Sequence, residues 1–412
     1  MKRRVVVTGM GAVTPVGNTV AEMWEGLING KNGIDFITQF DATNLKVKIA
    51  GEVKNLNPDL YLEPRESRRL DRSVLLALCA ATQAYNDANL NDDEIDHDRF
   101  GVFVTSGIGG INTISEEARK CVEKGGDRVS PFFIPNSIIN LIGGHIAIKF
   151  KAKGPALPVV TACSAGTNAI GEAFRYIRDG YIDMAFAGGA ESSINELSVG
   201  GFSSMKALNF SNDPNKASIP FDKNRSGFVM SEGSGVLILE EYESALKRGA
   251  NIYAEVVGYG TTCDAFHITA PDETADGITK CIKLALKDAN IKPTDIDYIN
   301  PHGTSTPYND KLETLGIKRV FGDDYKKVLV SGTKSMTGHA LGAIGAIEAI
   351  ISIKAINDWI IPPTINVTEV DEECDLNLVL DKALKHEVNY AMSNSLGFGG
   401  QNAVIILKKY SK

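Results

Sequence analysis

The stretch PVVTACSAGTNAIGEAFRYIRDGYIDMAFAGG, residues 158–189, decides the fold. Residues 159–161 are Val-Val-Thr, whose β-branched side chains predict a buried strand. Between residues 165 and 177 apolar residues recur at helical spacing, and Gly180 is typical of a helix end. Cys163 therefore falls where the strand turns into the helix. There the unpaired backbone N–H groups and the helix dipole favour the thiolate, which is the reactive form of cysteine.

Two interpretations of Cys163 are open on this stretch alone. It can be a nucleophile, because the small residues 164–166 leave room for a substrate to approach. It can equally be one more buried small side chain, as most free cysteines are.

Length, charge and cysteine usage narrow the class of protein. A chain of 412 residues predicts two or three structural units, or one large duplicated domain. The net charge of −8 argues against general nucleic-acid binding. The 6 cysteines form no CxxC pair, which is typical of free thiols in a reducing compartment.

No membrane or export signal is expected. The chain has no apolar run long enough to span a membrane, and its start, MKRRVVVTGMG, leads directly into a strand rather than a signal peptide. We therefore expect a bacterial-type cytoplasmic protein. The alternative is a plastid or the mitochondrial matrix, if a transit peptide has been removed.

One plan of strand, small-residue loop and apolar helix occurs twice. Around Cys163 it forms the first half, and in the second half the loop GTKSMTGH is followed by an apolar helix at 340–356. His339 there takes about the place of Cys163. We interpret this as a duplication into residues 1–250 and 251–412. The alternation predicts an α/β architecture with mainly parallel sheets, and so apolar a helix fits a layer between two sheets.

Other segments give local predictions. GMGAVTPVG at 9–17 lacks GxGxxG spacing, so we interpret it as a tight turn with close backbone packing rather than a phosphate site. The glycine- and serine-rich residues 200–204 predict a loop, and the apolar segment 130–144 fits a pocket wall or an oligomer contact. Residues 62–88 predict one long helix. Four arginines lie on one face of that helix: Arg65, Arg68, Arg69 and Arg72. This face can bind an acidic partner, or it can be an ordinary solvated face balanced by acidic neighbours.

Four residues could perform chemistry. Beside Cys163, these are His302 and His339, each following a strand, and Lys334, which precedes His339. A hydrolase elbow is a poor fit, because the glycines expected two residues on either side of the nucleophile are missing. A zinc site is formally possible but lacks any short ligand spacing. The third possibility is acyl transfer, in which the thiolate takes an acyl group and imidazole N–H groups stabilise an enolate oxygen.

Longer motifs make the last possibility specific. VTACSAGTNAIG, NPHGTSTPYND, SGTKSMTGHALGA and NSLGFGGQN occur in this order, and together the chain resembles the β-ketoacyl-acyl-carrier-protein synthases. The resemblance extends from VVVTGMGAVTPVG to GFGGQN, essentially the whole chain. SGIGG, GGFSSMKALN, FDKNRSGFVMSEGSG and DAFHITAP bring it close to the elongating type II members. A lysine and a second histidine point away from the initiating synthases and from the thiolases.

The resemblance implies a thiolase fold, with two related halves in five αβαβα layers, and a homodimer. It implies that Cys163 is the nucleophile. His302 and His339 would hold the malonyl thioester oxygen while carbon dioxide leaves. Lys334 would position them, with Glu348 as its partner, since a charged residue alone in an apolar helix needs one.

The same resemblance assigns the surroundings of these residues. Backbone N–H groups of Cys163 and Phe398 would form an oxyanion hole, and Phe398 would also gate the site. Thr304 and Thr306 would bind the phosphopantetheine arm, and Asp310 would be structural. An apolar acyl tunnel would be lined by Ile108 and Phe202, with Phe133 at its far end, from the second subunit or from this one. The candidate docking residues for acyl carrier protein (ACP) are Arg65, Arg68, Arg69, Arg72, Arg128 and Lys206.

The expected function is that of an acyltransferase. Acyl-ACP and malonyl-ACP would give β-ketoacyl-ACP and carbon dioxide in fatty-acid elongation, without organic cofactor or metal and without a nucleic-acid or membrane partner. The alternatives are a polyketide ketosynthase and a non-catalytic chain-length or scaffold partner, against which the presence of Cys163 argues. Four departures from the family pattern remove no catalytic group but bear on gating and chain length: Pro301, Gly332, Leu396 and Gln401.

Overall fold

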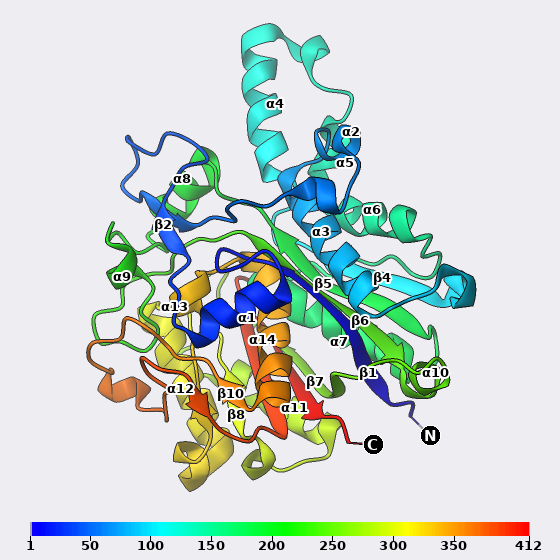
Figure 1. Ribbon diagram of the computed structural model, residues 1–412. Helices are drawn as coiled ribbons and strands as arrows, with labels where there is room; N and C mark the ends of the chain where they lie inside the picture. The colour runs from blue at the N-terminus through cyan, green and yellow to red at the C-terminus, as the bar shows by residue number, and fades with distance from the viewer. Residues whose placement is uncertain (1, 412) are drawn as a thin grey trace.

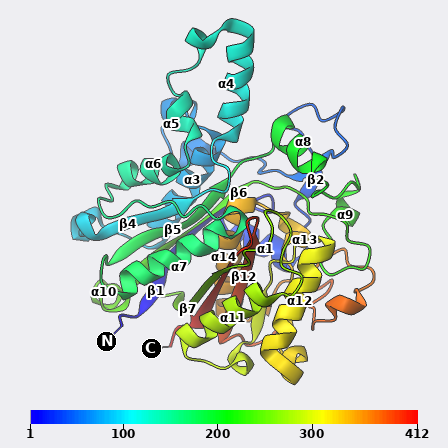
Figure 2. The same cartoon turned by 180° about the vertical axis from the view of Figure 1, so that it is seen from behind.

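The computed structural model describes residues 2–411 as an α/β protein with layers in the order αβαβα (Figures 1 and 2). Within residues 2–411, the main sheet has 9 strands in the order β4-β5-β6-β1-β7-β13-β12-β8-β9, and β2-β3 and β10-β11 form two small sheets. The strands of the first half are β1 (Val5–Val13), β4 (Phe100–Thr105), β5 (Met184–Glu191) and β6 (Gly233–Glu241). Those of the second half are β7 (Ala254–Cys263), β8 (Tyr298–Asn300), β9 (Leu329–Val330), β12 (Tyr390–Gly397) and β13 (Gln401–Lys409).

The two halves repeat one topology, as expected of a duplicated fold. In the first half β4 is parallel to β5, β5 antiparallel to β6, and β6 antiparallel to β1. In the second half β8, β12, β13 and β7 repeat that series of orientations. The prediction of mainly parallel sheets is therefore wrong. Each half mixes both orientations. In the second half, for example, a short turn after Gly397 reverses the chain between β12 and β13.

Helices fill the space between the halves and cover both outer faces. The central helices α7 (Ala165–Arg178) and α14 (Ile344–Asp358) contact strands of both halves. α3 (Arg72–Asp87) lies on the face of β1, β5 and β6 opposite α7, as the two views show (Figures 1 and 2). α6 (Asn140–Phe150) packs on β4, and α11 (Asp276–Ala289) with α12 (Pro307–Phe321) covers the second half. The apolar residues of α14 are buried, as predicted.

Shorter elements complete the chain, and α4 projects from the body (Figure 1). The helices are α1 (Val20–Ile28), α2 (Pro64–Ser67), α4 (Ile111–Lys124), α5 (Phe133–Ser137), α8 (Glu196–Ser204), α9 (Pro214–Ala217), α10 (Tyr242–Lys247) and α13 (Lys334–Thr337). The strands are β2 (Ile34–Phe36), β3 (Ile49–Gly51), β10 (Ile360–Ile361) and β11 (Leu384–Lys385). Within residues 2–411, no helix combines the length and the apolarity needed to cross a bilayer.

The first two glycines of the segment 9–17 allow close packing from within a strand. Gly9 and Gly11 lie within β1, which continues to Val13. A Cβ on Gly9 would lie 2.2 Å from the Ala84 oxygen of α3, and one on Gly11 would lie 1.9 Å from the oxygen of Ala80. The close-packing interpretation is thus confirmed, because these glycines let α3 lie directly on the strand. The predicted turn is also present but lies later in the segment, where Thr14 and Gly17 exchange backbone hydrogen bonds at 2.8 and 3.2 Å before α1 begins at Val20.

Three other local predictions are wrong. Residues 159–161 form no strand. Nearby, the backbone N–H group of Leu157 donates a hydrogen bond to the oxygen of Val102 in β4. Residues 200–204 end α8 instead of forming a loop. The helix predicted at 62–88 is broken into α2 and α3, because the side chain of Asp71 caps a new helix by accepting a hydrogen bond from the backbone of Ser73.

Candidate active site

One cavity of about 490 Å³ collects the candidate residues from both halves of the chain. Cys163 comes from the 3₁₀ turn Ala162–Ser164 before α7, and His302 follows β8. His339 lies just before the turn Leu341–Ala343 that leads into α14. Phe398 is in the loop between β12 and β13, and all four residues line the cavity.

The thiol of Cys163 is buried and held between two backbone N–H groups. Ala162 adopts a left-handed conformation with φ of 49°, which turns the chain sharply into α7. The N–H groups of Cys163 and Phe398 both interact with the sulfur and lower its pKa. Burial and the nearby carboxylate of Glu191 outweigh them and raise the pKa of Cys163 to about 12. In the free enzyme, burial and Glu191 therefore favour the thiol, although the two N–H groups act toward the expected thiolate.

The two histidines form a pair of neutral donors. The ring centroids of His302 and His339 lie 5.2 Å apart, with the rings nearly perpendicular at 85°. Burial and the positive charge of Lys334 lower the pKa of both rings well below the usual value. Each Nδ1 is buried without a partner, so Nε2 is the nitrogen that each ring can offer to a molecule in the cavity.

The loop that carries His302 is held by a residue that the sequence did not indicate. The buried carboxylate of Glu313 in α12 accepts hydrogen bonds from the backbone N–H groups of His302 at 2.7 Å and Gly303 at 2.8 Å. The side chain of Asn394 donates to the same carboxylate at 3.0 Å. The only sequence signal was an acidic residue on the inner face of an amphipathic helix, which gives no partner.

Lys334 and Glu348 form a buried ion pair beside the histidines. Lys334 Nζ lies 2.6 Å from Glu348 Oε1, and their side chains are 1% and 0% exposed. Burial raises the pKa of Glu348, and Lys334 opposes that effect. The pairing expected from the lone carboxylate in α14 is therefore present, and it places a positive charge close to His302 and His339.

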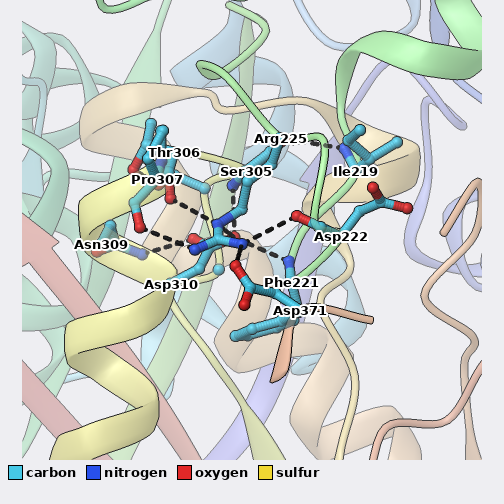
Figure 3. A network of polar contacts seen from close by, with 12 residues as sticks. Ile219, Phe221, Asp222, Arg225, Ser305, Thr306, Pro307, Asn309, Asp310 and Asp371 are labelled. Atoms are coloured by element: carbon cyan, nitrogen blue, oxygen red, sulfur yellow. Dashed lines mark hydrogen bonds and ion pairs between the residues drawn. The ribbon is translucent and has the colours of Figure 1, made fainter. Parts of the chain in front are cut away.

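A network of polar contacts fixes the wall that contains Thr304 and Thr306 (Figure 3). The hydroxyl oxygens of these two threonines lie 2.9 Å apart, and both residues line the cavity. The fully buried carboxylate of Asp310 accepts hydrogen bonds from the backbone of Phe221 and Ser305. These contacts make Asp310 a support of the wall rather than part of its surface.

Arg225 ties the same wall to the rest of the fold, and sequence reasoning missed it. Its guanidinium donates to the carbonyl oxygens of Thr306 at 3.1 Å and Pro307 at 2.9 Å, as Figure 3 shows. It also pairs with Asp371 at 2.6 Å and lies 3.7 Å from Asp310. A buried arginine so placed holds three segments that are far apart in the sequence.

The apolar end of the cavity lies next to the nucleophile. Ile108 and Phe202 line it together with Cys163, and they pack in one apolar cluster with Phe228. Phe133 does not line the cavity within this chain. It lies half-buried in α5. The structure thus brings two of the three proposed tunnel residues to the site.

The proposed docking arginines do not form one stripe. Arg72 is a structural residue, since its guanidinium pairs with the buried carboxylate of Glu232 at 2.7 Å and donates to the Val53 oxygen. Its assignment to docking is therefore wrong, and the cause is the break in the predicted helix. The other five candidates are exposed: Arg65, Arg68, Arg69, Arg128 and Lys206.

The geometry does not favour the zinc alternative. Within residues 2–411, no three side chains of His, Cys, Asp or Glu are grouped so that they could hold a metal ion. The cysteine and the histidines therefore share a cavity without forming a ligand set.

Comparisons with known proteins agree with this site. The model of the beta-ketoacyl synthase N-terminal domain matches residues 2–245, and that of the C-terminal domain matches residues 253–368. A Synechocystis protein named 3-oxoacyl-[acyl-carrier-protein] synthase 2 is 50% identical over 410 residues, covering 99% of both chains. A Staphylococcus aureus protein of the same name is 48% identical over 408 residues, covering 99% of both.

Solved structures give the same result. A beta-ketoacyl synthase from Burkholderia phymatum has a TM-score of 0.92 at 34% identity, with 100% of both chains covered. A type II polyketide ketosynthase, solved in complex with its acyl-carrier protein, has a TM-score of 0.93 at 34% identity over 100% of both chains. This chain has the thiolase fold of these enzymes and belongs to the beta-ketoacyl synthase family, with relatives named 3-oxoacyl-[acyl-carrier-protein] synthase 2 along its full length.

Proposed function

We propose that the chain condenses acyl-ACP with malonyl-ACP to give β-ketoacyl-ACP, carbon dioxide and free ACP in fatty-acid elongation. The observation that supports this most directly is the meeting of Cys163 with two neutral imidazoles in one cavity. The names of the relatives that are 48% and 50% identical support the same reaction.

In the first half-reaction Cys163 takes the acyl group. Its sulfur attacks the thioester carbonyl, and the oxyanion that forms accepts hydrogen bonds from the N–H groups of Cys163 and Phe398. The bond to the pantetheine sulfur then breaks, and the proton lost by Cys163 ends on that sulfur as ACP leaves. Because the resting group is a thiol, its deprotonation accompanies the arrival of the donor rather than preceding it.

In the second half-reaction the histidines act on malonyl-ACP. The Nε2–H groups of His302 and His339 donate to the thioester oxygen, and the electron pair released by the loss of carbon dioxide forms an enolate there. The enolate carbon attacks the acyl-Cys163 carbonyl, the C–S bond breaks, and Cys163 regains a proton from water. Neutral rings that carry the proton on Nε2 can donate to the enolate oxygen without the cost of a buried positive charge.

No organic cofactor or metal is needed in this scheme, since the loss of carbon dioxide drives formation of the carbon–carbon bond. Thr304 and Thr306 bind the pantetheine arm, Phe398 gates the cavity, and the acyl chain passes Ile108 and Phe202. We place the enzyme in the cytoplasm, in keeping with the bacterial origin of the relatives from Synechocystis and Staphylococcus aureus.

The carrier is expected to bind at the exposed cations around the site. Arg65, Arg68 and Arg69 lie in and just after α2, and Arg128 and Lys206 are also exposed. ACP is acidic, whereas this chain has a net charge of −8, so binding depends on local positive charge. The double variant Arg68→Glu/Arg69→Glu should slow acylation by acyl-ACP and weaken its salt dependence. Equal losses with an acyl-pantetheine thioester would contradict this role.

A homodimer is supported by apolar side chains next to β4. Phe132, Ile134 and Ile138 are exposed around α5, and Leu157 and Val160 are exposed in the segment before Cys163. A monomer would leave these side chains in water, so we assign them to contact with a second copy of the chain. Sedimentation equilibrium at micromolar concentration should give twice the mass of 44.3 kDa, and a single-chain mass would contradict the dimer.

The decisive experiment is intact-mass spectrometry of the purified enzyme. Acyl-ACP should add one acyl group that peptide mapping locates on Cys163, and malonyl-ACP should then remove it as β-ketoacyl-ACP. The different-class alternative, a non-catalytic scaffold, predicts no acylation at all. A polyketide ketosynthase, supported by solved structures at 34% and 36% identity, predicts repeated condensation without reduction.

A further inference from the structure

Glu191, the last residue of β5, is a fully buried carboxylate that no step above uses. It accepts hydrogen bonds from five donors, three of them in the loop after β4. Those donors are Ser106 Oγ at 2.7 Å, Gly107 N at 2.8 Å, Ile108 N at 3.3 Å, Ser193 Oγ at 3.2 Å and Gly342 N at 3.0 Å.

Every partner of Glu191 is a neutral hydrogen-bond donor. Within residues 2–411, no lysine, arginine or histidine lies within salt-bridge distance of its carboxylate. Two other fully buried carboxylates have a cation: Glu240 pairs with Arg248 at 2.8 Å, and Glu232 with Arg72 at 2.7 Å, whereas Glu313 and Glu191 have none among residues 2–411. Glu191 instead receives backbone N–H groups, which suit an ionised carboxylate and fix the segments that supply them.

Those segments belong to the site. The loop of residues 106–108 places Ile108 in the apolar end of the cavity, and Gly342 lies three residues after His339. The two backbones touch, since a Cβ on Gly342 would lie 2.1 Å from the nitrogen of Gly107. The charge of Glu191 also acts on Cys163, whose pKa it raises.

We propose that Glu191 is a positioning residue that holds Ile108 in the acyl pocket and thereby sets which acyl chain lengths reach Cys163. The proposal rests on the proposed acylation of Cys163. The backbone at Ile108 cannot shift while its own N–H group and that of Gly107 are bound to the carboxylate, so the Ile108 side chain stays at the apolar end of the cavity. A long acyl chain therefore has to displace a loop that Glu191 restrains, whereas a short chain stops before it.

Two serines offer a matched pair of variants. Ser106 and Ser193 are both buried, and both donate to the same oxygen of Glu191. Only Ser106 belongs to the loop that carries Ile108, and its hydroxyl also accepts from Gly109 N at 2.9 Å. Ser106→Ala should free the loop, whereas Ser193→Ala should weaken the carboxylate site without freeing it.

The measurement is the rate at which C4 and C12 acyl-pantetheine thioesters acylate Cys163, followed by intact mass, with the melting temperature of each variant recorded. We expect the ratio of the C12 rate to the C4 rate to rise at least threefold in Ser106→Ala and to stay at the wild-type value in Ser193→Ala. Any other pattern of the two ratios overturns the positioning role, including equal losses of both rates with lower melting temperature.

A double variant shows whether the effect passes through Ile108. Glu191→Gln should raise the same ratio, and in an Ile108→Ala background it should change the ratio no further. If Glu191→Gln and Ile108→Ala instead change the ratio by independent factors that multiply in the double variant, the proposal is overturned. Failure of the wild-type enzyme to be acylated by either thioester would instead refute the proposed function, so the two failures are distinguishable.

Discussion

The buried pair of Lys334 and Glu348 can be tested by replacing both residues at once. The pair sits between α13 and α14 with almost no solvent contact, at a separation of 2.6 Å. Such a pair contributes little to stability, because the cost of desolvating both charges offsets their attraction. Its position beside two histidines indicates that it is kept for catalysis instead.

The magnitudes differ sharply between the single and the double replacement. Glu348→Leu alone leaves the Lys334 ammonium buried without a partner and should lower the free energy of unfolding by about 3–5 kcal/mol. Lys334→Met together with Glu348→Leu removes both charges at similar volume, among the Ala and Ile side chains of α14. This double variant should be as stable as the wild type, or more stable by about 1–4 kcal/mol.

Activity should follow the opposite order. Without the Lys334 charge, burial is the main remaining factor that opposes protonation of His302 and His339, and the positive charge that would stabilise the enolate is lost. We expect malonyl decarboxylation by the double variant to fall about 100-fold, the usual effect of losing an oxyanion stabiliser. Acylation of Cys163 should fall less, because its oxyanion hole consists of backbone N–H groups.

Urea denaturation and the release of carbon dioxide from malonyl-ACP measure these two quantities. A double variant that is stable and decarboxylates at the wild-type rate would refute the catalytic role of the pair. A cost below about 1 kcal/mol for Glu348→Leu would refute the premise that the pair is fully desolvated, since this is the range of exposed pairs.

Four further outcomes are expected. Alkylation of Cys163 by iodoacetamide should rise about tenfold per pH unit from pH 7 to 10, because its pKa is raised to about 12, and a plateau near pH 8 would contradict this. His302→Ala should slow decarboxylation at least about 100-fold and acylation much less; equal losses would make the ring a base for the thiol. Ile108→Phe should block C12 but not C4 chains without lowering the melting temperature, whereas a core site would lose about 1–3 kcal/mol and affect all lengths. Arg72→Ala should lower the unfolding free energy by about 3 kcal/mol in urea titrations, by leaving Glu232 unpaired, and unchanged stability would return Arg72 to the surface.

The residues that sequence reasoning found share one property, which is that their local setting reveals them. Cys163 stands before a helix with small neighbours, and His302 and His339 follow strands in loops of Gly, Thr and Ser. Lone Glu348 in a helix of Ala and Ile announces a need for a partner. Such signals depend only on a few adjacent residues, so they can be recognised without knowledge of the tertiary contacts.

The errors arose where tertiary contacts outweigh the local pattern. The periodicity at 62–88 was helical, but the side-chain cap of Asp71 starts a new helix and turns Arg72 toward Glu232, 160 residues away. The helix dipole at Cys163 favours a thiolate, but burial and the charge of Glu191 prevail. Neither partner can be identified from the residues that surround Arg72 or Cys163 in the sequence.

Glu191 illustrates what can and cannot be predicted from the sequence. It ends MAFAGGAE, a run in which every residue is buried, so a charge there is anomalous and marks a site of some kind. Four of its five donors, however, lie 83 to 151 residues away, among them Ser106 and Gly342. A buried carboxylate without a cation needs several N–H groups at once, and only the folded arrangement of strand ends supplies them. The anomaly can thus be read from the sequence, but its link to the acyl pocket requires the structure.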